Sequence, residues 1–181
     1  MLARLLARSF YDDPFAVWIE PDDDRRLANL EEQFLTFFEE VFVPRRQIDV
    51  LGGDEPFAQA VWAPPGTYDL TPEEGERVGA RLAGVLGDEM GRVGQALDEV
   101  EGRRPPGEYW YLEFLGVDPD LQRQGHGGRL LASGLERVDG PAYLWTAKER
   151  NLPFYEAHGF EVTWSETIPG DGPPVWGMWR P

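Results

Sequence analysis

The sequence predicts a mixed α/β protein, a single domain over residues 1–181 with a central twisted, mostly antiparallel sheet of about six strands flanked by helices. Three observations favour this class. Residues 47–51 and 57–63 are apolar runs joined by a glycine-containing turn, as in a β-hairpin. An aromatic run at 109–117 leads through a glycine-rich turn into an amphipathic run at 129–138, as in a strand followed by a helix. Strands and helices also alternate irregularly, so a regular βαβ repeat is not expected.

The first third of the chain is expected to be mainly helical. Leucines share one side of a helix over residues 2–10, and Pro14 ends it because the residue before a proline disfavours the helical conformation. A short apolar segment follows at residues 15–19. Three consecutive aspartates then precede a second helix, roughly residues 25–42, which they can cap. The hairpin comes next.

The remaining elements follow from similar patterns. Thr71 is a good N-cap residue, Pro72 suits the first helical position, and apolar residues continue at helical spacing to Val100. Four glycines interrupt that stretch, so one broken helix or two shorter helices are expected. A surface loop is expected at residues 102–107, and a short helix is expected after Asn151. The later strands are expected at 109–117, 142–146, 160–164 and 175–179.

The composition narrows the classes of function. The chain has 33 acidic and 17 basic residues, a net charge of −16, which argues against nucleic acid and anionic membrane surfaces as partners. No apolar run approaches the ~20 residues that span a bilayer, and two arginines interrupt the first eight residues, unlike a signal peptide. With no cysteine and two histidines, neither a metal site nor a cysteine nucleophile is expected. We therefore predict a soluble, cytoplasmic protein.

The glycine-rich turn between Gln122 and Arg129 is the most informative stretch. A helix that begins with glycines exposes unpaired backbone N–H groups, and the helix dipole adds partial positive charge, so this turn suits phosphate. Residues 121–150 also hold more bases than acids, unlike the rest of the chain. A dinucleotide fingerprint is disfavoured because Leu130 occupies the position of its third glycine, and the Lys-Ser/Thr pair of a P-loop is absent. A glycine-rich helix start without any ligand is the alternative.

Two motifs resemble signatures of the GCN5-related N-acetyltransferase (GNAT) family. The spacing Gln122-x-x-Gly125-x-Gly127 resembles the family loop that holds the diphosphate of coenzyme A. Residues 151–160 resemble the second signature, a short helix that ends at a glycine before a strand. Within the family, the chain most resembles the puromycin N-acetyltransferase branch. The segments that carry this likeness are 60–65, 115–119, 150–156 and 175–179.

The resemblance implies the GNAT fold and a site for acetyl-CoA. Relatives usually have a strand before the first helix, whereas this sequence starts within that helix. Either that first strand is missing, or the true start lies upstream, or another segment fills the edge of the sheet. The strand at residues 109–117 is implied to bind the cofactor, and a bulge at residues 115–117 is expected to separate it from the next strand. Gly116 suits such a bulge, and a backbone N–H nearby is expected to polarise the thioester. The residues implied to contact the cofactor are Leu115, Gly116, Val117, Gln122, Arg123, Gln124, Gly125, His126, Gly127, Gly128, Arg129, Asn151, Phe154 and Tyr155.

Two residues are candidates for catalysis. The resemblance implies Tyr155 as the general acid that protonates the leaving thiolate, and an ordinary core tyrosine is the alternative. Glu113 is the candidate base for the incoming amine, and an ion-paired glutamate is the alternative. Trp18 and Trp62 are candidates for an aromatic pocket that binds a cationic or planar amine, unless they are simply core residues. Asn151 can also cap the short helix.

We therefore expect an N-acetyltransferase that transfers the acetyl group of acetyl-CoA to a primary amine of a small molecule, such as an aminonucleoside or another antibiotic, by direct attack in a ternary complex. A non-catalytic acyl-CoA-binding domain and an acyltransferase for a longer acyl group are the alternatives. No metal, nucleic acid or membrane partner is expected. A monomer or a homodimer is compatible with the sequence.

Overall fold

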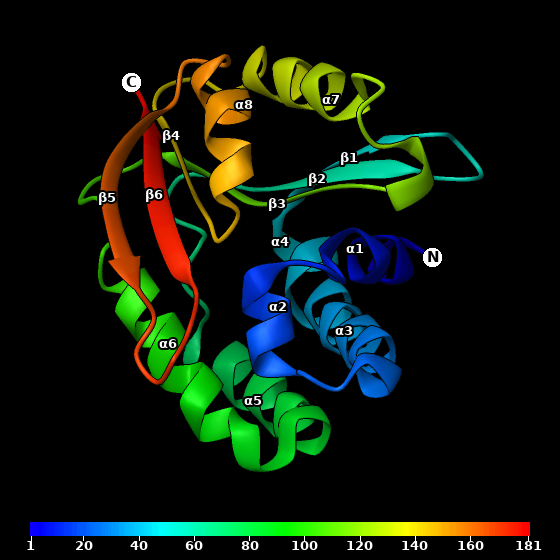
Figure 1. The fold of residues 1–181 in the computed structure, drawn as a ribbon. Coiled ribbons are helices and arrows are strands. Elements are labelled where there is room, and N and C mark those ends of the chain that lie inside the picture. Colours follow the sequence, from blue (N-terminus) through cyan, green and yellow to red (C-terminus); the bar gives the residue numbers. More distant parts are fainter.

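The computed structural model describes all 181 residues and has one six-stranded sheet with helices on both faces (Figure 1). This confirms the predicted mixed α/β class. The strands are β1 (Gln47–Leu51), β2 (Ala58–Ala63), β3 (Trp110–Val117), β4 (Ala142–Thr146), β5 (Glu161–Thr167) and β6 (Pro174–Arg180). The helices are α1 (Leu2–Phe10), α2 (Pro14–Ile19), α3 (Asp23–Phe37) with a π-helical turn (Phe38–Phe42), α4 (Val43–Arg45), α5 (Pro72–Leu86), α6 (Met90–Glu101), α7 (His126–Leu135) and α8 (Leu152–Glu156). Three 3₁₀ turns occupy Gly87–Glu89, Pro119–Leu121 and Glu149–Asn151.

The sheet is antiparallel except in its middle. Its strand order is β1-β2-β3-β4-β6-β5, and only β3 and β4 run parallel. These two strands pair only at Trp110 with Ala142 and at Tyr111 with Tyr143, so they diverge beyond Tyr111. The predicted splay of the cofactor strand is therefore present. The strand β1 forms one edge, and α1 precedes it in the chain.

The irregularity in β3 lies two residues earlier than predicted. The register against β2 changes between Val61, which pairs with Phe114, and Trp62, which pairs with Leu112. Glu113 is thus the extra residue, and the expected bulge at residues 115–117 is wrong.

Gly116 serves a packing purpose instead. A Cβ atom on Gly116 would lie 2.9 Å from Cδ2 of Leu6 and 3.0 Å from Oγ of Ser9. Because such distances are shorter than van der Waals contact, any larger residue would push α1 away from the sheet. Ser9 also donates a hydrogen bond of 3.0 Å to the Val117 carbonyl, which fixes α1 across the end of β3.

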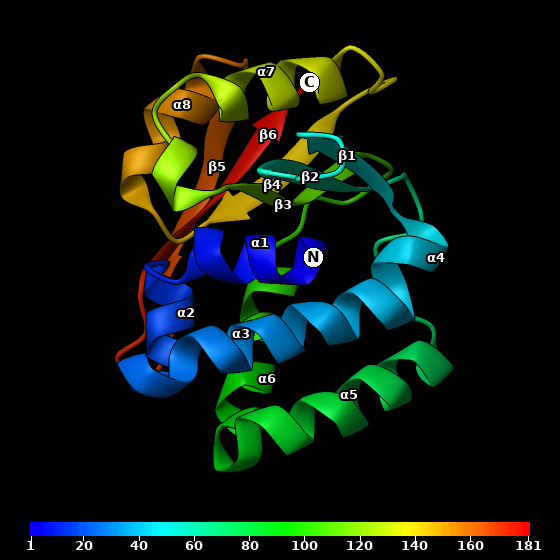
Figure 2. The same ribbon diagram turned by 90° about the vertical axis from the view of Figure 1, so that its right-hand side faces the viewer.

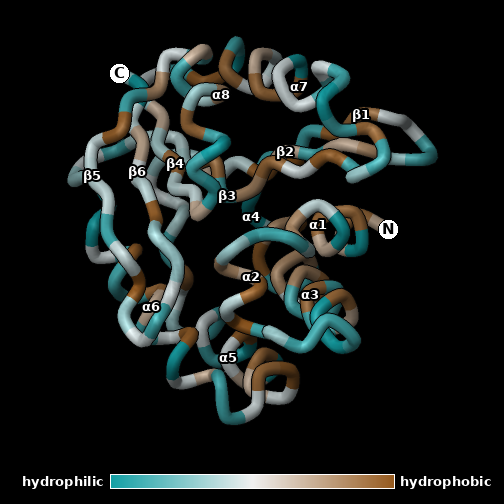
Figure 3. The backbone as a smooth tube through the Cα atoms, in the orientation of Figure 1, coloured by the Kyte–Doolittle hydropathy of each residue, from teal (hydrophilic) through white to brown (hydrophobic).

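The two faces of the sheet carry different layers (Figure 2). Helices α7 and α8 cover one face, and α1, α3 and α5 lie beyond the other. Each layer has its own apolar core: Leu6 and Val61 belong to the lower one, and Leu131 and Leu144 to the upper one, all with no exposed surface. In the hydropathy colouring of Figure 3, α1, α3 and α5 alternate between hydrophilic and hydrophobic stretches, as helices with one buried side do.

Local signals explain the helix boundaries. Residues 15–19, predicted only as an apolar segment, form α2 together with Pro14, because Asp13 accepts a 2.9 Å hydrogen bond from the Phe15 amide and proline suits the first helical position. The predicted cap at Thr71 is confirmed, with a reciprocal hydrogen bond to Glu74. The expected break in the following helix occurs at Gly87, whose φ is +54°. None of the helices is long and apolar enough to cross a membrane.

Candidate functional site

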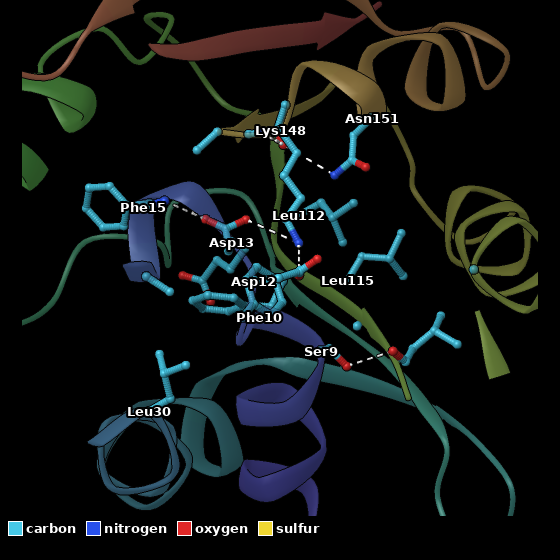
Figure 4. Close-up of a pocket in the computed structure, with 18 of the residues that line it drawn as sticks. Ser9, Phe10, Asp12, Asp13, Phe15, Leu30, Leu112, Leu115, Lys148 and Asn151 are labelled. Atoms are coloured by element: carbon cyan, nitrogen blue, oxygen red, sulfur yellow. Dashed lines mark hydrogen bonds and ion pairs between the residues drawn. The ribbon is translucent and has the colours of Figure 1, made fainter. Parts of the chain in front are cut away.

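A cavity of about 1030 Å³ opens where β3 and β4 diverge (Figure 4). One part of its wall is polar and comes from the loop before α7, the end of β4 and α8. The other part is apolar and comes from α2, α3, α5 and α6. A turn between α1 and α2, which carries Asp12 and Asp13, lies between these two parts.

The start of α7 offers a row of free backbone donors. The amides from Arg123 to Gly128 donate to no carbonyl or side chain of the protein, and no side chain caps the helix. Gly125 has φ +83° and Arg123 has φ +61°, so the loop turns through left-handed backbone before the helix begins. Unpaired amides and the positive end of the helix dipole together fit an anionic group such as a diphosphate.

The loop before α7 is held by β3 and α1. Gln122 donates through Nε2 to the Val117 carbonyl at 3.1 Å. Asp118 receives two hydrogen bonds of 3.0 Å from Arg8, and this contact holds the pKa of the Asp118 carboxyl below its usual range. Gln122, predicted as a cofactor contact, therefore has at least a positioning role for the loop.

Most of the basic residues in the stretch 121–150, where bases outnumber acids, are paired with carboxylates. Lys148 and Arg150 contact Asp12 at 2.6 Å and 2.8 Å, and Arg137 contacts Asp49. The other two basic residues of this stretch, Arg123 and Arg129, have no carboxylate partner. Of these two, Arg123 lines the cavity and Arg129 does not. Arg129 and Gln124 were both expected to contact the cofactor, but they lie outside the cavity wall.

Aromatic side chains close the wall beside α7. A Cβ atom on Gly127 or Gly128 would lie 3.9 Å from the ring of Phe154, an ordinary van der Waals distance, so this ring packs beside the start of α7. The ring of His126 lies edge-on to Phe57 with centroids 4.9 Å apart. Gly127, Gly128, His126 and Phe154 all line the cavity, as the predicted cofactor contacts would.

Asn151 does not cap α8, contrary to the structural alternative in the sequence. Its side chain makes no capping hydrogen bond and instead donates through Nδ2 to Oγ1 of Thr146 at 3.5 Å. Both residues line the cavity at the end of β4. Asn151 therefore presents its amide to the cavity instead of to the helix backbone.

Tyr155 lies on α8, lines the cavity and is only 8% exposed. Burial raises the pKa of its phenol well above the ordinary value, and the negative charge of Asp13 adds to the shift. The phenol therefore stays protonated at neutral pH and can give up a proton only to a basic group inside the cavity.

Glu113 is engaged in an ion pair. Each of its carboxylate oxygens accepts a hydrogen bond of 2.8 Å from Arg46, whose side chain is only 1% exposed. Burial raises the pKa of Glu113 and Arg46 opposes that change. Because taking up a proton would leave a buried guanidinium without its partner, Glu113 is poorly suited to act as a base.

Asp13 is a functional candidate that the sequence reasoning missed. It is buried, it lines the cavity, and its charge acts on Tyr155 across the cavity. Burial raises the pKa of its carboxyl, opposed mainly by Lys148. The only signal in the sequence is the Asp12-Asp13-Pro14 turn. Such a turn is typical of a helix end, and a capping role is enough to explain an aspartate there, so the turn does not indicate a functional carboxylate.

The expected aromatic pocket of Trp18 and Trp62 is wrong, because the two side chains lie elsewhere. Trp62 is 1% exposed and packs under α7, where a Cβ atom on Gly134 would lie 2.8 Å from its Nε1. Trp18 lies under the guanidinium of Arg92, 4.3 Å from the ring centroid, and donates to the Gly170 carbonyl. Neither side chain lines the cavity.

Known proteins share this architecture. Residues 75–162 match the family model described as acetyltransferase (GNAT) domain. The N-alpha-acetyltransferase RimI of Mycobacterium tuberculosis is 33% identical over 114 residues, which are 60% of this chain and 64% of the relative, slightly less than two thirds of its length.

Solved structures agree over almost the whole chain. A Corynebacterium glutamicum protein described as histone acetyltransferase HPA2 and related acetyltransferase has a TM-score of 0.75 at 24% identity, covering 99% of this chain and 88% of that one. The polyamine N-acetyltransferase of Drosophila melanogaster has a TM-score of 0.57 at 18% identity, covering 97% and 90%. Residues 75–162 are therefore similar to a GNAT acetyltransferase domain, and the whole chain shares the fold of the Corynebacterium glutamicum protein.

Proposed function

We propose that the protein is an N-acetyltransferase that transfers the acetyl group of acetyl-CoA to a primary amine by direct attack in a ternary complex. The observation that carries the proposal is the continuity of one cavity. It joins the free amides at the start of α7, the gap between β3 and β4, the Tyr155 phenol and the Asp13 carboxylate.

The residues present fit the acyl donor. The amides of residues 123–128 suit its diphosphate, and Arg123 adds a cation without a competing carboxylate. Beyond Tyr111, the β3 edge facing β4 has no strand partner, so its backbone groups are available to the amides of a pantetheine arm. When bound, the donor supplies a thioester, and the chain supplies binding, orientation and proton transfer.

Proton transfer requires an acid and a base on the two sides of the attack. An alkylammonium with a pKa of ~10.4 costs roughly 4–5 kcal/mol to deprotonate at neutral pH, so the reaction needs a base. Asp13 is that base, because it is the cavity carboxylate without an arginine partner. Tyr155 is the acid. A thiolate in the same buried cavity is more basic than in water, which favours accepting the phenol proton.

The acceptor amine has two candidate classes. A small-molecule amine, including an aminonucleoside of the puromycin branch or another antibiotic, stays the leading prediction. The name of the Mycobacterium tuberculosis relative supports an α-amine as a second acceptor. A non-catalytic acyl-CoA-binding domain and a preference for a longer acyl group are the competing functions.

Calorimetry followed by an amine panel tests the proposal. We expect acetyl-CoA to bind at micromolar concentration and NAD not to bind, and coenzyme A release to depend on an added primary amine. Binding of NAD without acetyl-CoA would refute the proposal. Binding of acetyl-CoA with no turnover over α-amines, polyamines, alkylamines and aminonucleosides would identify a non-catalytic binding domain.

The Arg123→Gly variant is expected to weaken acetyl-CoA binding about three- to tenfold, with a smaller effect at high salt, because it removes the free cation beside the diphosphate. Thermal stability should change little, since glycine relieves the backbone strain at φ +61° while adding freedom to the unfolded chain. Calorimetry and thermal melts measure the two effects. Asp171→Gly is the matched control, since Asp171 has φ +59° and lies outside the cavity wall. Equal affinities of wild type and Arg123→Gly would remove Arg123 from the site.

A further inference from the structure

The cavity extends past the reacting groups into a chamber made almost entirely of hydrocarbon side chains. Four helices, which lie beneath the sheet in Figure 2, form it, and we call it the apolar chamber. Its walls are Ile19 of α2, Leu30, Phe34 and Phe37 of α3, Leu82 and Leu86 of α5, and Val93 and Leu97 of α6. Transfer of an acetyl group to a small polar amine does not need such a surface.

Helical periodicity directs these side chains into one space. Leu30, Phe34 and Phe37 are four and three residues apart, so they lie on one face of α3. The pairs on α5 and α6 are each separated by four residues, so each pair lies on one face of its helix, and all four side chains pack in the same apolar cluster as Leu30 and Phe34. The chamber is thus built from regular helix faces together with Ile19 of α2.

A carboxylate lies at the mouth of the chamber. In Figure 4, Asp13 lies between Lys148 above it and Leu30 below it. Its Oδ1 accepts the Phe15 amide, whereas its Oδ2 lies 3.9 Å from Nζ of Lys148, too far for a hydrogen bond. Lys148 instead contacts Asp12 at 2.6 Å. One oxygen of Asp13 is therefore available to a second ammonium group.

One polar group inside the chamber has no partner. Gln33 lines the cavity one turn from Leu30 and Phe37, and its Nε2 atom is buried without a hydrogen-bond acceptor. A buried donor without an acceptor is costly and uncommon in folded proteins. A ligand with an acceptor oxygen within the chamber would satisfy it.

We infer that the acceptor is a lipophilic primary amine: its ammonium binds the free oxygen of Asp13, its hydrocarbon body fills the apolar chamber, and an oxygen on that body accepts from Gln33. This inference rests on the proposed N-acetyltransferase function and specifies its acceptor. The amine nitrogen forms the amide bond as the thioester C–S bond breaks. The bound ammonium loses two protons, the first to Asp13 before the attack and the second as the amide forms. The departing sulfur gains one through Tyr155, so one proton is released in all.

A ladder of linear alkylamines is the primary experiment. Each added methylene should raise kcat/KM about threefold if it enters an apolar site, so hexylamine should exceed ethylamine by about a hundredfold. Val93→Phe, which fills the chamber, should lower the ratio of hexylamine to ethylamine kcat/KM at least tenfold. Leu97→Phe serves the same purpose if Val93→Phe does not fold. Val162→Phe on the exposed strand β5 is the size-matched control, and its ratio should equal that of wild type.

The role of Gln33 is measured with a pair of amines of equal length, hexylamine and an analogue with an ether oxygen in its chain. Gln33→Leu should reduce the preference for the ether relative to hexylamine about tenfold, because only the ether satisfies the buried donor. An unchanged preference would separate Gln33 from the acceptor site.

The outcomes separate this inference from the function on which it rests. Failure of acetyl-CoA to bind and of every amine to react refutes the proposed function. If ethylamine and hexylamine react equally well, the function stands and the lipophilic acceptor is refuted. If hexanoyl-CoA gains over acetyl-CoA while the amine ladder stays flat, and Val93→Phe abolishes that gain, the chamber belongs to the acyl group and the inference is overturned.

Discussion

Replacing Tyr155 by phenylalanine is expected to lower kcat by about a hundredfold and to change the affinity for acetyl-CoA less than twofold. General acid catalysis typically contributes 10²–10⁴-fold, and loss of the proton donor acts on the chemical step instead of on binding. The stability should be nearly unchanged, because burial and the charge of Asp13 dominate the surroundings of the phenol and no hydrogen bond to it is lost. Single-turnover kinetics and calorimetry separate the two effects.

Tyr143→Phe is the matched control for this experiment. Tyr143 is also a buried tyrosine, but it lies outside the cavity wall, so kcat should stay near that of wild type. A Tyr155→Phe enzyme with wild-type kcat would show that Tyr155 is a core residue and that water protonates the thiolate. If Tyr155 is the acid, the wild-type kcat should fall only at a pH above the ordinary tyrosine pKa of ~10, because burial raises the pKa of this phenol.

Local signals in the sequence predicted most of the fold because they are decided within a few residues. The hairpin, the capped helix at Thr71 and the glycine-rich entry to α7 each depend on neighbours in the chain. The divergence of β3 and β4 was predicted from the family resemblance alone, because no separate pattern of residues indicates it. The bulge at Glu113 was misplaced because it depends on the register against β2, which a single strand does not encode.

The candidate site was predictable only in part. Residues on one stretch, such as the loop from Gln122 to Gly128, were located by their motif. The contact between Glu113 and Arg46 joins residues 67 positions apart, and no local pattern indicates it. The placement of Asp13 in the same cavity as Tyr155 likewise depends on how α1 packs against β3. The apolar chamber requires four helices, and their inward-facing residues look like ordinary core residues in the sequence.

Arg46→Met is expected to destabilise the protein by about 3–5 kcal/mol, because breaking a buried ion pair leaves its other charge without compensation. Arg46 also donates to the Thr67 carbonyl at 2.7 Å, and this hydrogen bond is lost as well, although the carbonyl still accepts from Arg45 at 3.0 Å. Urea unfolding at neutral pH measures the loss. The double variant Arg46→Met/Glu113→Leu should recover most of it, since an apolar pair of similar volume can replace a buried ion pair.

The pH dependence of this variant tests the same contact. Burial already raises the pKa of Glu113 despite Arg46, and removal of the guanidinium should raise it further. A carboxyl whose pKa is higher in the folded state than in the unfolded state, ~4.3, destabilises the fold only when ionised. The deficit of Arg46→Met relative to wild type should therefore be small at a pH near 4 and grow as the pH rises through the folded pKa. A deficit that stays constant with pH would mean that the Arg46 side chain stabilises through packing and its carbonyl contacts, and Glu113 would then be available again as a base.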